Sequence, residues 1–305
     1  MHPRTEDKAA QGFTEARTRE LLFKACCETG LNPDGAKLLR HQTNAVYLLE
    51  SDRTVVKIAR PDYDIEHVKR TVDLTRWLLG QGFPTVPLCD IAQPVIADGS
   101  AVTFWRYLPQ TYPISAADIA EPLRRLHKLP APPLTAVPEL PRLDAVSAIR
   151  YSIDREHILS EDDHGFLLER CESLKAVLNE LRYERHPCLL HGDPQHGNAL
   201  RDGLGTVLCD WESAVIGPSE WDLVTIEIHC RRFSHPPETY SAFCRIYGRD
   251  IREWDGFPWL RDLRELRMIA TNARKSASNS RGAAEVRQRV AQLQLTGPAG
   301  RWSIL

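Results

Sequence analysis

The chain has 305 residues, of which 42% are hydrophobic and 26% are charged, as in an ordinary globular protein with enough apolar material for a core. Its 39 lysines and arginines and 41 acidic residues leave a formal net charge of −2. These values exclude a disordered or collagen-like chain. They also leave no overall basic field that would hold nucleic acid or an anionic membrane surface.

The cysteines and the apolar runs of the sequence indicate the cellular compartment in which the protein is expected. None of the eight cysteines forms a C-x-x-C pair, and most lie in apolar runs, as Cys188 and Cys209 do. Such cysteines are typical of buried thiols in a reducing compartment. The charged N-terminal residues do not resemble a signal peptide, and no apolar run reaches the roughly 18 residues of a membrane span. We therefore expect a cytoplasmic protein.

The residues up to about 107 alternate between helical and strand patterns. Apolar residues spaced three, four and seven apart follow Asp64, and β-rich runs flank both the Asp98-Gly99 turn and the polar residues 50–53. The expected helices cover 14–27 and 64–79, and the expected strands include 44–49, 54–58, 91–95 and 101–107. Five strands and one intervening helix predict a small domain that mixes helices with a sheet.

After Pro109 helical patterns dominate the chain. The expected helical stretches cover 116–129, 143–183, 220–247 and 260–295, with one strand-loop-strand insert over 188–211. The sequence therefore predicts an α+β fold of two lobes. A β-rich N-terminal lobe would cover residues 1–107, and a mainly helical C-terminal lobe would cover residues 108–305.

The densest set of reactive side chains lies in the strand-loop-strand insert. His191-Gly192-Asp193 follows one apolar run, Asn198 comes five residues after Asp193, and Asp210 ends the next apolar run. Mg²⁺ prefers hard oxygen ligands and usually takes one or two carboxylates beside phosphate oxygens. Asn198 and Asp210 can supply such ligands. Asp193 is then left to orient a hydroxyl group and accept its proton.

These motifs resemble those of a known family. The 191–193 motif with Asn198 resembles the catalytic loop of the aminoglycoside phosphotransferase family, relatives of the protein kinases. The segment 210–212 resembles that family's form of the metal-binding D-F-G, and Gly217 and Asp222 match its usual continuation. The resemblance implies a two-lobed, protein-kinase-like fold. It also implies an ATP- and Mg²⁺-dependent transfer of the γ-phosphate to a hydroxyl group of a small molecule, either an antibiotic or a metabolite.

The same resemblance implies a lysine on the phosphates of ATP. The run Val55-Val56-Lys57-Ile58 resembles the strand whose lysine pairs with the α- and β-phosphates. Its carboxylate partner stays open between Glu66 and Asp73, which lie seven residues apart on the next expected helix. We favour Glu66 because its side chain reaches farther.

Other nucleotide contacts follow from the resemblance. The turn before the second strand has no glycine, so the polar side chains of Thr43 and Asn44 are expected to cover the phosphates instead of a glycine-rich loop. The connection between the lobes, at Trp105 and Tyr107, is expected to bind the adenine.

Alternatives within the same architecture remain open. One is a metabolite kinase of the choline- or homoserine-kinase type, and another is a non-catalytic, kinase-like nucleotide-binding module. The presence of Lys57, Asp193, Asn198 and Asp210 together favours an enzyme. From Leu108 onward the chain has 27 acidic and 25 basic residues, so we expect a neutral or singly cationic acceptor rather than a polycationic aminoglycoside.

Overall fold

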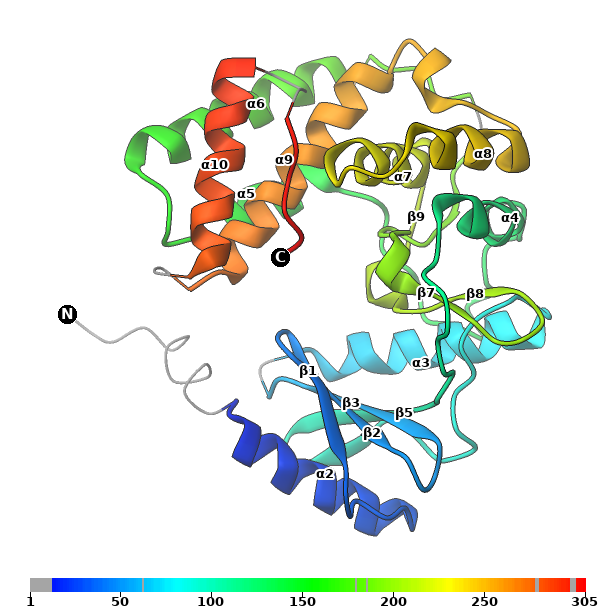
Figure 1. The fold of residues 1–305 in the computed structure, drawn as a ribbon. Coiled ribbons are helices and arrows are strands. Elements are labelled where there is room, and N and C mark those ends of the chain that lie inside the picture. Colours follow the sequence, from blue (N-terminus) through cyan, green and yellow to red (C-terminus); the bar gives the residue numbers. More distant parts are fainter. Residues whose placement is uncertain (1–12, 62, 179, 185, 278–279, 297–299) are drawn as a thin grey trace. The chain divides into compact units, whose positions relative to one another are not determined.

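The computed structural model describes residues 13–305 apart from 62, 179, 185, 278–279 and 297–299 (Figure 1). The chain divides into two compact units. The main segment of the first unit ends at Pro113, and residues 132–140 and 200–212 also belong to this unit. The second unit comprises residues 114–131, 141–199 and 213–305. The sequence suggests one boundary near residue 107, whereas the structure returns two later segments to the first unit.

Backbone hydrogen bonds attach one of these returning segments to the first unit. The N–H group of Val86 donates to the carbonyl of Leu208, and the N–H group of Leu208 donates to the carbonyl of Pro84, both at 3.0 Å. Leu208 is fully buried. The segment is therefore part of this unit's core rather than a loop on its surface.

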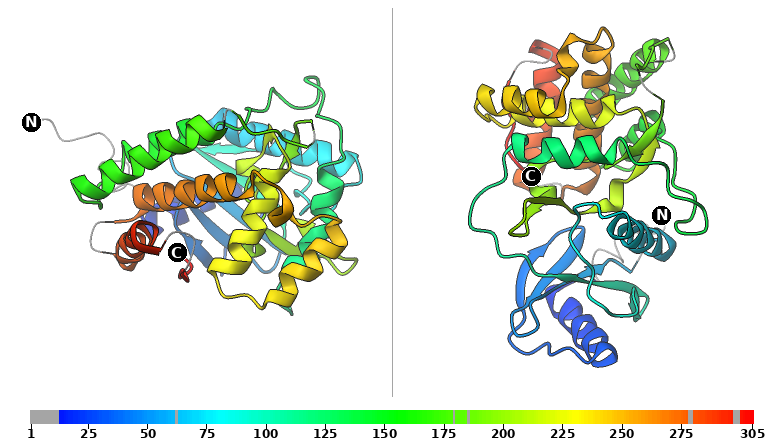
Figure 2. Two further views of the ribbon diagram at one scale, coloured as in Figure 1. Left: turned by 90° about the horizontal axis from the view of Figure 1, so that it is seen from above. Right: turned by 90° about the vertical axis from the view of Figure 1, so that its right-hand side faces the viewer.

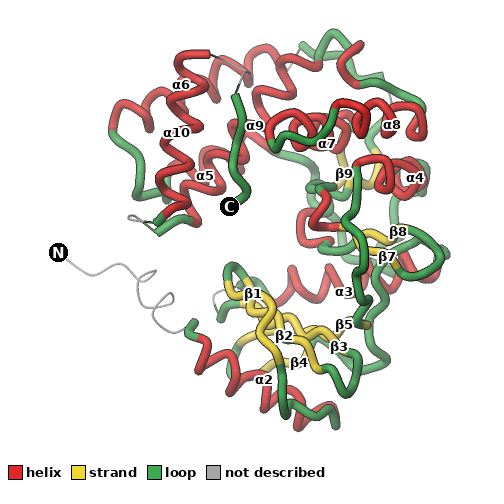
Figure 3. The backbone as a smooth tube through the Cα atoms, in the orientation of Figure 1, coloured by secondary structure: helices red, strands yellow, loops and turns green. Residues whose placement is uncertain are grey.

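The first unit is built on a five-stranded antiparallel sheet, which confirms the expected number of strands (Figure 3). The strand order is β1-β2-β3-β5-β4. The strands are β1 (Lys37–His41), β2 (Asn44–Leu49), β3 (Thr54–Ala59), β4 (Val95–Ala97) and β5 (Ser100–Arg106), and the helices are α2 (Glu15–Thr29) and α3 (Ile65–Gly80).

The strand expected at 91–95 is displaced. It forms as β4 over Val95–Ala97, after Pro94, which lacks the backbone N–H group that a ladder needs. The preceding Gln93 instead uses its side chain, whose Oε1 accepts a hydrogen bond from the N–H group of Phe104 at 2.8 Å. A side chain thus takes the place of a strand backbone beside β5.

Alternation along β3 decides where its side chains point. Successive residues of a strand face opposite sides of the sheet. Val56 and Ile58 are fully buried in a core that they share with α2. Ala59 lies in the separate cluster that contains Val68 of α3. Lys57 therefore projects from the face opposite α2.

The second unit is mainly helical. Its helices are α4 (Ala116–Leu126), α5 (Ala145–Ile153), α6 (Glu161–Leu178), α7 (Glu220–Arg232), α8 (Pro237–Tyr247), α9 (Phe257–Lys275) and α10 (Arg281–Thr296). Helix α9 (orange) contacts α5, α6, α7 and α10, and Figure 2 shows it between the green α6 and the yellow α7. Strand β6 (Cys188–Leu190) pairs antiparallel with β9 (Val215–Gly217) in this unit. The remaining pair, β7 (Ala199–Arg201) and β8 (Thr206–Leu208), lies almost wholly in the segment 200–212 of the first unit.

Three stretches that the sequence presents as continuously helical are each divided into two helices. Pro236 and Pro237 supply no backbone N–H groups, and α8 begins there after α7 has ended. The hydroxyl groups of Ser160 and Ser280 accept hydrogen bonds from N–H groups in the first turns of α6 and α10, as helix caps do. Among the described residues, no helix is both long and apolar enough to cross a membrane.

Candidate active site

The loop that carries the predicted catalytic residues follows β6 and begins with a left-handed turn. Gly192 has φ +82°, and a Cβ atom at this position would lie 2.0 Å from the carbonyl oxygen of Ser213. Both facts require glycine here. The N–H groups of His191 and Gly192 donate to the two carboxylate oxygens of Asp222, at 2.8 and 2.9 Å. The turn is thereby fixed to the first turn of α7.

Asp222 is completely buried and fully hydrogen-bonded. Besides the two N–H groups of the loop, its Oδ2 is 3.0 Å from Nε2 of His127 at the end of α4. Nδ1 of His127 in turn lies 2.8 Å from the hydroxyl of Tyr247 in α8. The loop that carries Asp193 therefore has its backbone tied to three helices of the same unit.

We expect Asp222→Ala to lower the free energy of unfolding by about 3–5 kcal/mol, because it leaves buried N–H groups and an imidazole without their acceptor. Urea denaturation measures this change. Asp202→Ala is the matched control, since Asp202 also accepts two backbone hydrogen bonds, from Leu204 and Gly205, but on an exposed turn. Equal losses in the two variants would contradict the anchoring role of Asp222.

Asp193 is held by a donor on each carboxylate oxygen. Its Oδ1 accepts a hydrogen bond from Arg264 at 2.7 Å, and its Oδ2 accepts one from Nδ2 of Asn198 at 3.2 Å. Nδ2 of Asn198 also donates to the backbone carbonyl of Asp193, at 2.9 Å. The Asp193 side chain is still 35% exposed. It is thus a carboxylate of fixed orientation that a hydroxyl group can reach.

Arg264 was not expected from the sequence, where the arginines of 261–289 suggest solvated faces of packed helices. In the structure it is buried, and its guanidinium lies 5.1 Å from the ring centroid of Trp221. The available signal is its position between Leu263 and Glu265, within a run whose neighbours are buried too. An arginine on the core side of a helix needs a carboxylate partner, and Asp193 is that partner.

Lys57 is paired with two carboxylates of its own unit. Its ammonium nitrogen lies 2.8 Å from Oδ1 of Asp210 and 2.6 Å from Oε1 of Glu212. Burial works against the charged ammonium, but Asp210 and Glu212 outweigh it and raise the pKa of Lys57. Glu212 also accepts hydrogen bonds from Asn44 at 3.1 Å and from Tyr63 at 3.3 Å. The structure thus brings Lys57, Asn44 and Asp210 into one polar cluster.

Glu66 lies outside this cluster. It is exposed in the first turn of α3, where it pairs with Lys69 at 2.7 Å. Asp73 pairs with Arg76. Within the described chain, the ammonium of Lys57 is therefore matched by neither of the two carboxylates that the sequence offered. Glu212, which belongs to the segment that resembles the metal-binding motif, is the glutamate that pairs with Lys57.

The remaining nucleotide-binding candidates lie at or near the ends of strands of the sheet. Thr43 is in the tight turn between β1 and β2. The indole N–H group of Trp105 donates to Oγ1 of Thr103, and the backbone N–H group of Tyr107 donates to the carbonyl of Arg53 at 2.8 Å. These groups are engaged within the first unit, and their contact with a nucleotide remains a prediction.

The predicted metal ligands are chemically suited to Mg²⁺. Asn198 uses its amide nitrogen toward Asp193, which leaves the amide oxygen as the ligating atom. Asp210 has φ +66°, a left-handed conformation that costs a non-glycine residue about 1–3 kcal/mol and is typical of functional positions. Across the described residues, no group of three or more His, Cys, Asp or Glu side chains could hold a metal by itself. An ion bound by either residue would therefore need further oxygen ligands, and phosphate oxygens are the usual ones for Mg²⁺.

A cluster of imidazoles lies near Asp193. The rings of His196 and His235 stack at 4.1 Å, and His229 is 6.5 Å from His196. Burial lowers the pKa of His196 to about 4, with His235 adding to the effect. Burial lowers the pKa of His229 to about 3, although Asp193 acts in the opposite direction. Both rings are therefore neutral at neutral pH.

The low pKa of His229 predicts sensitivity to acid. His229 takes up a proton near pH 6.5 in the unfolded chain but only near pH 3 in the folded chain. The free energy of unfolding is therefore unaffected by the protonation of this residue above about pH 6.5 and decreases as the pH falls from 6.5 toward 3. The free energy of unfolding, measured by urea denaturation, is expected to fall between pH 7 and pH 5 in the wild type. We expect this fall to be about 1–2 kcal/mol smaller in His229→Phe. His157→Phe, at an exposed position, is the control. Parallel curves for wild type and His229→Phe would refute the assignment.

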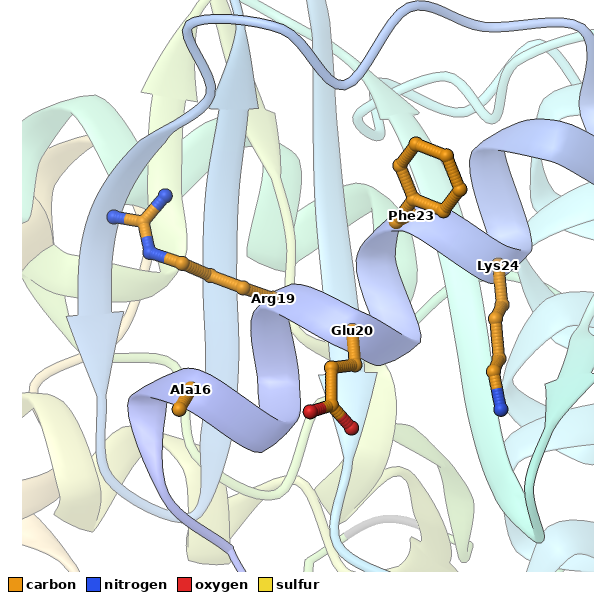
Figure 4. Close-up of a pocket in the computed structure, with 5 residues that line it drawn as sticks. All are labelled: Ala16, Arg19, Glu20, Phe23 and Lys24. Atoms are coloured by element: carbon orange, nitrogen blue, oxygen red, sulfur yellow. The ribbon is translucent and has the colours of Figure 1, made fainter.

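A shallow hollow on the surface of the first unit is formed by helix α2 and lies apart from the candidate catalytic residues. Figure 4 shows that helix α2 supplies all of its labelled residues, Ala16, Arg19, Glu20, Phe23 and Lys24. The charged side chains are engaged in surface ion pairs, Glu20 with Arg17 and Lys24 with Asp98. It is a surface hollow beside ion pairs and not a second reactive site.

Solved structures share this fold. An amicoumacin kinase in complex with AMP-PNP and Ca²⁺ is 14% identical, with a TM-score of 0.72 over 95% of this chain and 98% of that chain. A microcompartment-associated aminopropanol kinase is 16% identical, with a TM-score of 0.72 over 92% and 99%. An aminoglycoside phosphotransferase from Streptomyces rimosus is 20% identical, with a TM-score of 0.61 over 82% and 98%. These similarities confirm the predicted kinase-like α+β fold.

Sequence comparison identifies the family. No curated protein sequence matches the chain. The model of a phosphotransferase enzyme family, designated APH, matches residues 35–263. This match covers well over half of the chain and includes Lys57, Asp193, Asn198 and Asp210. The chain belongs to the phosphotransferase enzyme family, as its catalytic-loop motif predicted.

Proposed function

We propose that the protein uses ATP and Mg²⁺ to phosphorylate a hydroxyl group of a small molecule. The observation that carries the proposal is Asp193, a reachable carboxylate whose two oxygens are each fixed by a donor, Arg264 and Asn198. A group so placed can orient an acceptor hydroxyl and receive its proton as the oxygen attacks the γ-phosphate. The family membership and the kinase-like fold support this assignment.

The other residues would serve the nucleotide. Lys57 would contact the phosphates, and its two carboxylate partners keep the ammonium charged and in place. Asp210 and Asn198 would hold the metal through their oxygen atoms. When bound, Mg²⁺ neutralises phosphate charge and so lowers the barrier to attack by an oxygen nucleophile. Thr43, Asn44, Trp105 and Tyr107 would line the nucleotide on the side of the sheet.

The acceptor belongs to the class of small hydroxylated molecules, antibiotic or metabolite. The solved relatives are named for substrates of both kinds, amicoumacin and aminopropanol. Eight free cysteines support a reducing cytoplasm as the place of the reaction. The near balance of charge supports a reaction without nucleic acid or membrane partners.

An acceptor screen tests the proposal. The protein is incubated with ATP and Mg²⁺ and with a panel of amino alcohols, hydroxy acids, sugars and hydroxylated antibiotics, and the ADP formed is measured. We expect ADP formation that depends on one class of acceptor and disappears without Mg²⁺. ATP binding without ADP formation from any class of acceptor would instead indicate a nucleotide-binding module.

A further inference from the structure

Two arginines lie on one face of α9, beside the catalytic loop of the second unit. Arg264 and Arg267 are three residues apart, and their guanidinium groups lie 5.1 and 5.4 Å from the ring centroid of Trp221. Trp221 is fully buried, and its indole N–H group donates to the carbonyl of Gly192 at 3.3 Å. The tryptophan therefore seats both arginines next to the residue that precedes Asp193.

The two arginines differ in their partners. Arg264 is neutralised by Asp193. Arg267 makes no ion pair with any residue that the structure describes, although Asp193 and Asp144 act on it from a greater distance. Asp144 is engaged as the cap of α5, where it accepts a hydrogen bond from the N–H group of Ser147 at 2.9 Å. The guanidinium of Arg267 thus has no direct ion partner among the described residues, although it lies within electrostatic range of the proposed base.

Arg267 keeps its charge at neutral pH despite its surroundings. Burial and then the neighbouring Arg264 lower its pKa to about 10. A partly buried cation next to a second cation is destabilising unless an anion joins them. Arginine binds carboxylates and phosphates through two parallel hydrogen bonds, which makes it the usual side chain for recognising oxyanions.

The acidic residues nearby do not favour a cationic acceptor. Glu220 and Glu227, which could have met such a substrate, are buried on α7 and paired with Arg249 at 2.8 Å and with Arg231 at 2.9 Å. These two carboxylates are therefore already engaged, whereas Arg267 offers a guanidinium with no direct ion partner in the described part of the chain.

We propose that Arg267 binds an oxyanionic group of the acceptor, a carboxylate or a phosphate ester, so that the preferred substrate is a hydroxylated acid. This inference rests on the proposed phosphotransfer and goes beyond it. It replaces the expectation of a neutral or singly cationic acceptor, which came from counting charges over the whole lobe. Arg264 holds the base, and Arg267 selects what approaches it.

The first test compares acceptors of similar size. These are 3-hydroxybutyrate and glycerol 2-phosphate as acids, 1-amino-2-propanol as a cation and 1,2-propanediol as a neutral alcohol. We expect kcat/KM for the acids to exceed that for the cation by at least tenfold. Arg267→Gln is expected to raise the KM of the acids at least tenfold while the KM of ATP stays constant. Arg274→Gln, at an exposed position of the same helix, is the control.

Each contrary result is distinct. A preference for the cation would overturn the inference and leave the proposed function standing. A change in the KM of ATP instead of the acceptor would show that Arg267 serves the nucleotide. No acceptor-dependent ADP with any compound would count against the proposed function.

A binding measurement keeps the inference testable without turnover. The protein is saturated with AMP-PNP and Mg²⁺, and its affinity for 3-hydroxybutyrate and for inorganic phosphate is measured by calorimetry. We expect Arg267→Gln to weaken the binding of at least one of these anions tenfold or more, and Arg274→Gln to leave it unchanged. Equal anion affinities in the wild type and Arg267→Gln, or no anion binding by the wild type, would overturn the inference.

Discussion

Replacing Asp193 by asparagine is expected to lower kcat by about 10²–10⁴-fold, the usual contribution of one positioned base. Asparagine can still accept the hydrogen bond from Arg264, but it cannot take a proton, and its amide nitrogen opposes that of Asn198. Since its proposed role is toward the acceptor hydroxyl, ATP affinity should change little. Steady-state kinetics with the best acceptor and calorimetry with ATP measure the two effects.

Asp202→Asn, on an exposed turn, controls for a general loss of carboxylate charge. A near-normal kcat in Asp193→Asn would assign the base elsewhere. A large loss of ATP affinity would instead place Asp193 among the nucleotide contacts.

Replacing Asp210 by asparagine is expected to abolish the magnesium dependence of ATP affinity and to lower kcat by about 10³-fold. A metal ion contributes several kcal/mol to a reaction of this kind. The comparison is made by titrating ATP with and without Mg²⁺. Glu212→Gln is the matched control, because Glu212 also pairs with Lys57 but is not a proposed ligand.

We expect Glu212→Gln to raise the KM of ATP through a less well-placed Lys57 and to keep the magnesium dependence. An unchanged magnesium dependence in Asp210→Asn would contradict the metal role. Loss of that dependence in both variants would show that the cluster around Lys57 acts as a unit.

The sequence predicts those features that depend on local patterns. Alternating β-rich runs gave the hairpin of β2 and β3, and the spacing from Asp193 to Asn198 is set by a short loop whose hydrogen bonds are local. The strand expected at 91–95 was misplaced because Pro94 has no backbone N–H group to donate to a neighbouring strand. A prediction from the average composition of a short segment does not take this missing donor into account. Two of the three divided helices were missed because the serine caps of α6 and α10 resemble ordinary surface residues in a long polar pattern, and the third because Pro236 and Pro237 interrupt an otherwise helical pattern.

The contacts between distant segments could not be predicted in the same way. Arg264 meets Asp193 across 71 positions of the chain, and Glu212 meets Lys57 across more than 150. No periodicity relates such pairs, because the packing of helices and sheet decides which ends of long side chains meet. The lack of a direct ion partner for Arg267 among the residues that the structure describes is likewise a property of its surroundings and not of its neighbours in sequence.

The buried link from Asp222 to the loop backbone has a consequence for how substrate choice can change. Because the peptide groups before Asp193 are held by α7, through an acceptor that is fully buried, the backbone position of the proposed base does not depend on Arg267, while Arg264 of α9 fixes its side chain. Substitutions at Arg267 and its exposed neighbours can therefore accumulate without dismantling the reaction centre. Directed evolution toward new acceptors should vary Arg267 and the exposed positions of α9, and should leave Arg264, Asp222, His127 and Tyr247 fixed. The molecule thus separates a part that tolerates diversification from a part that conserves the chemistry.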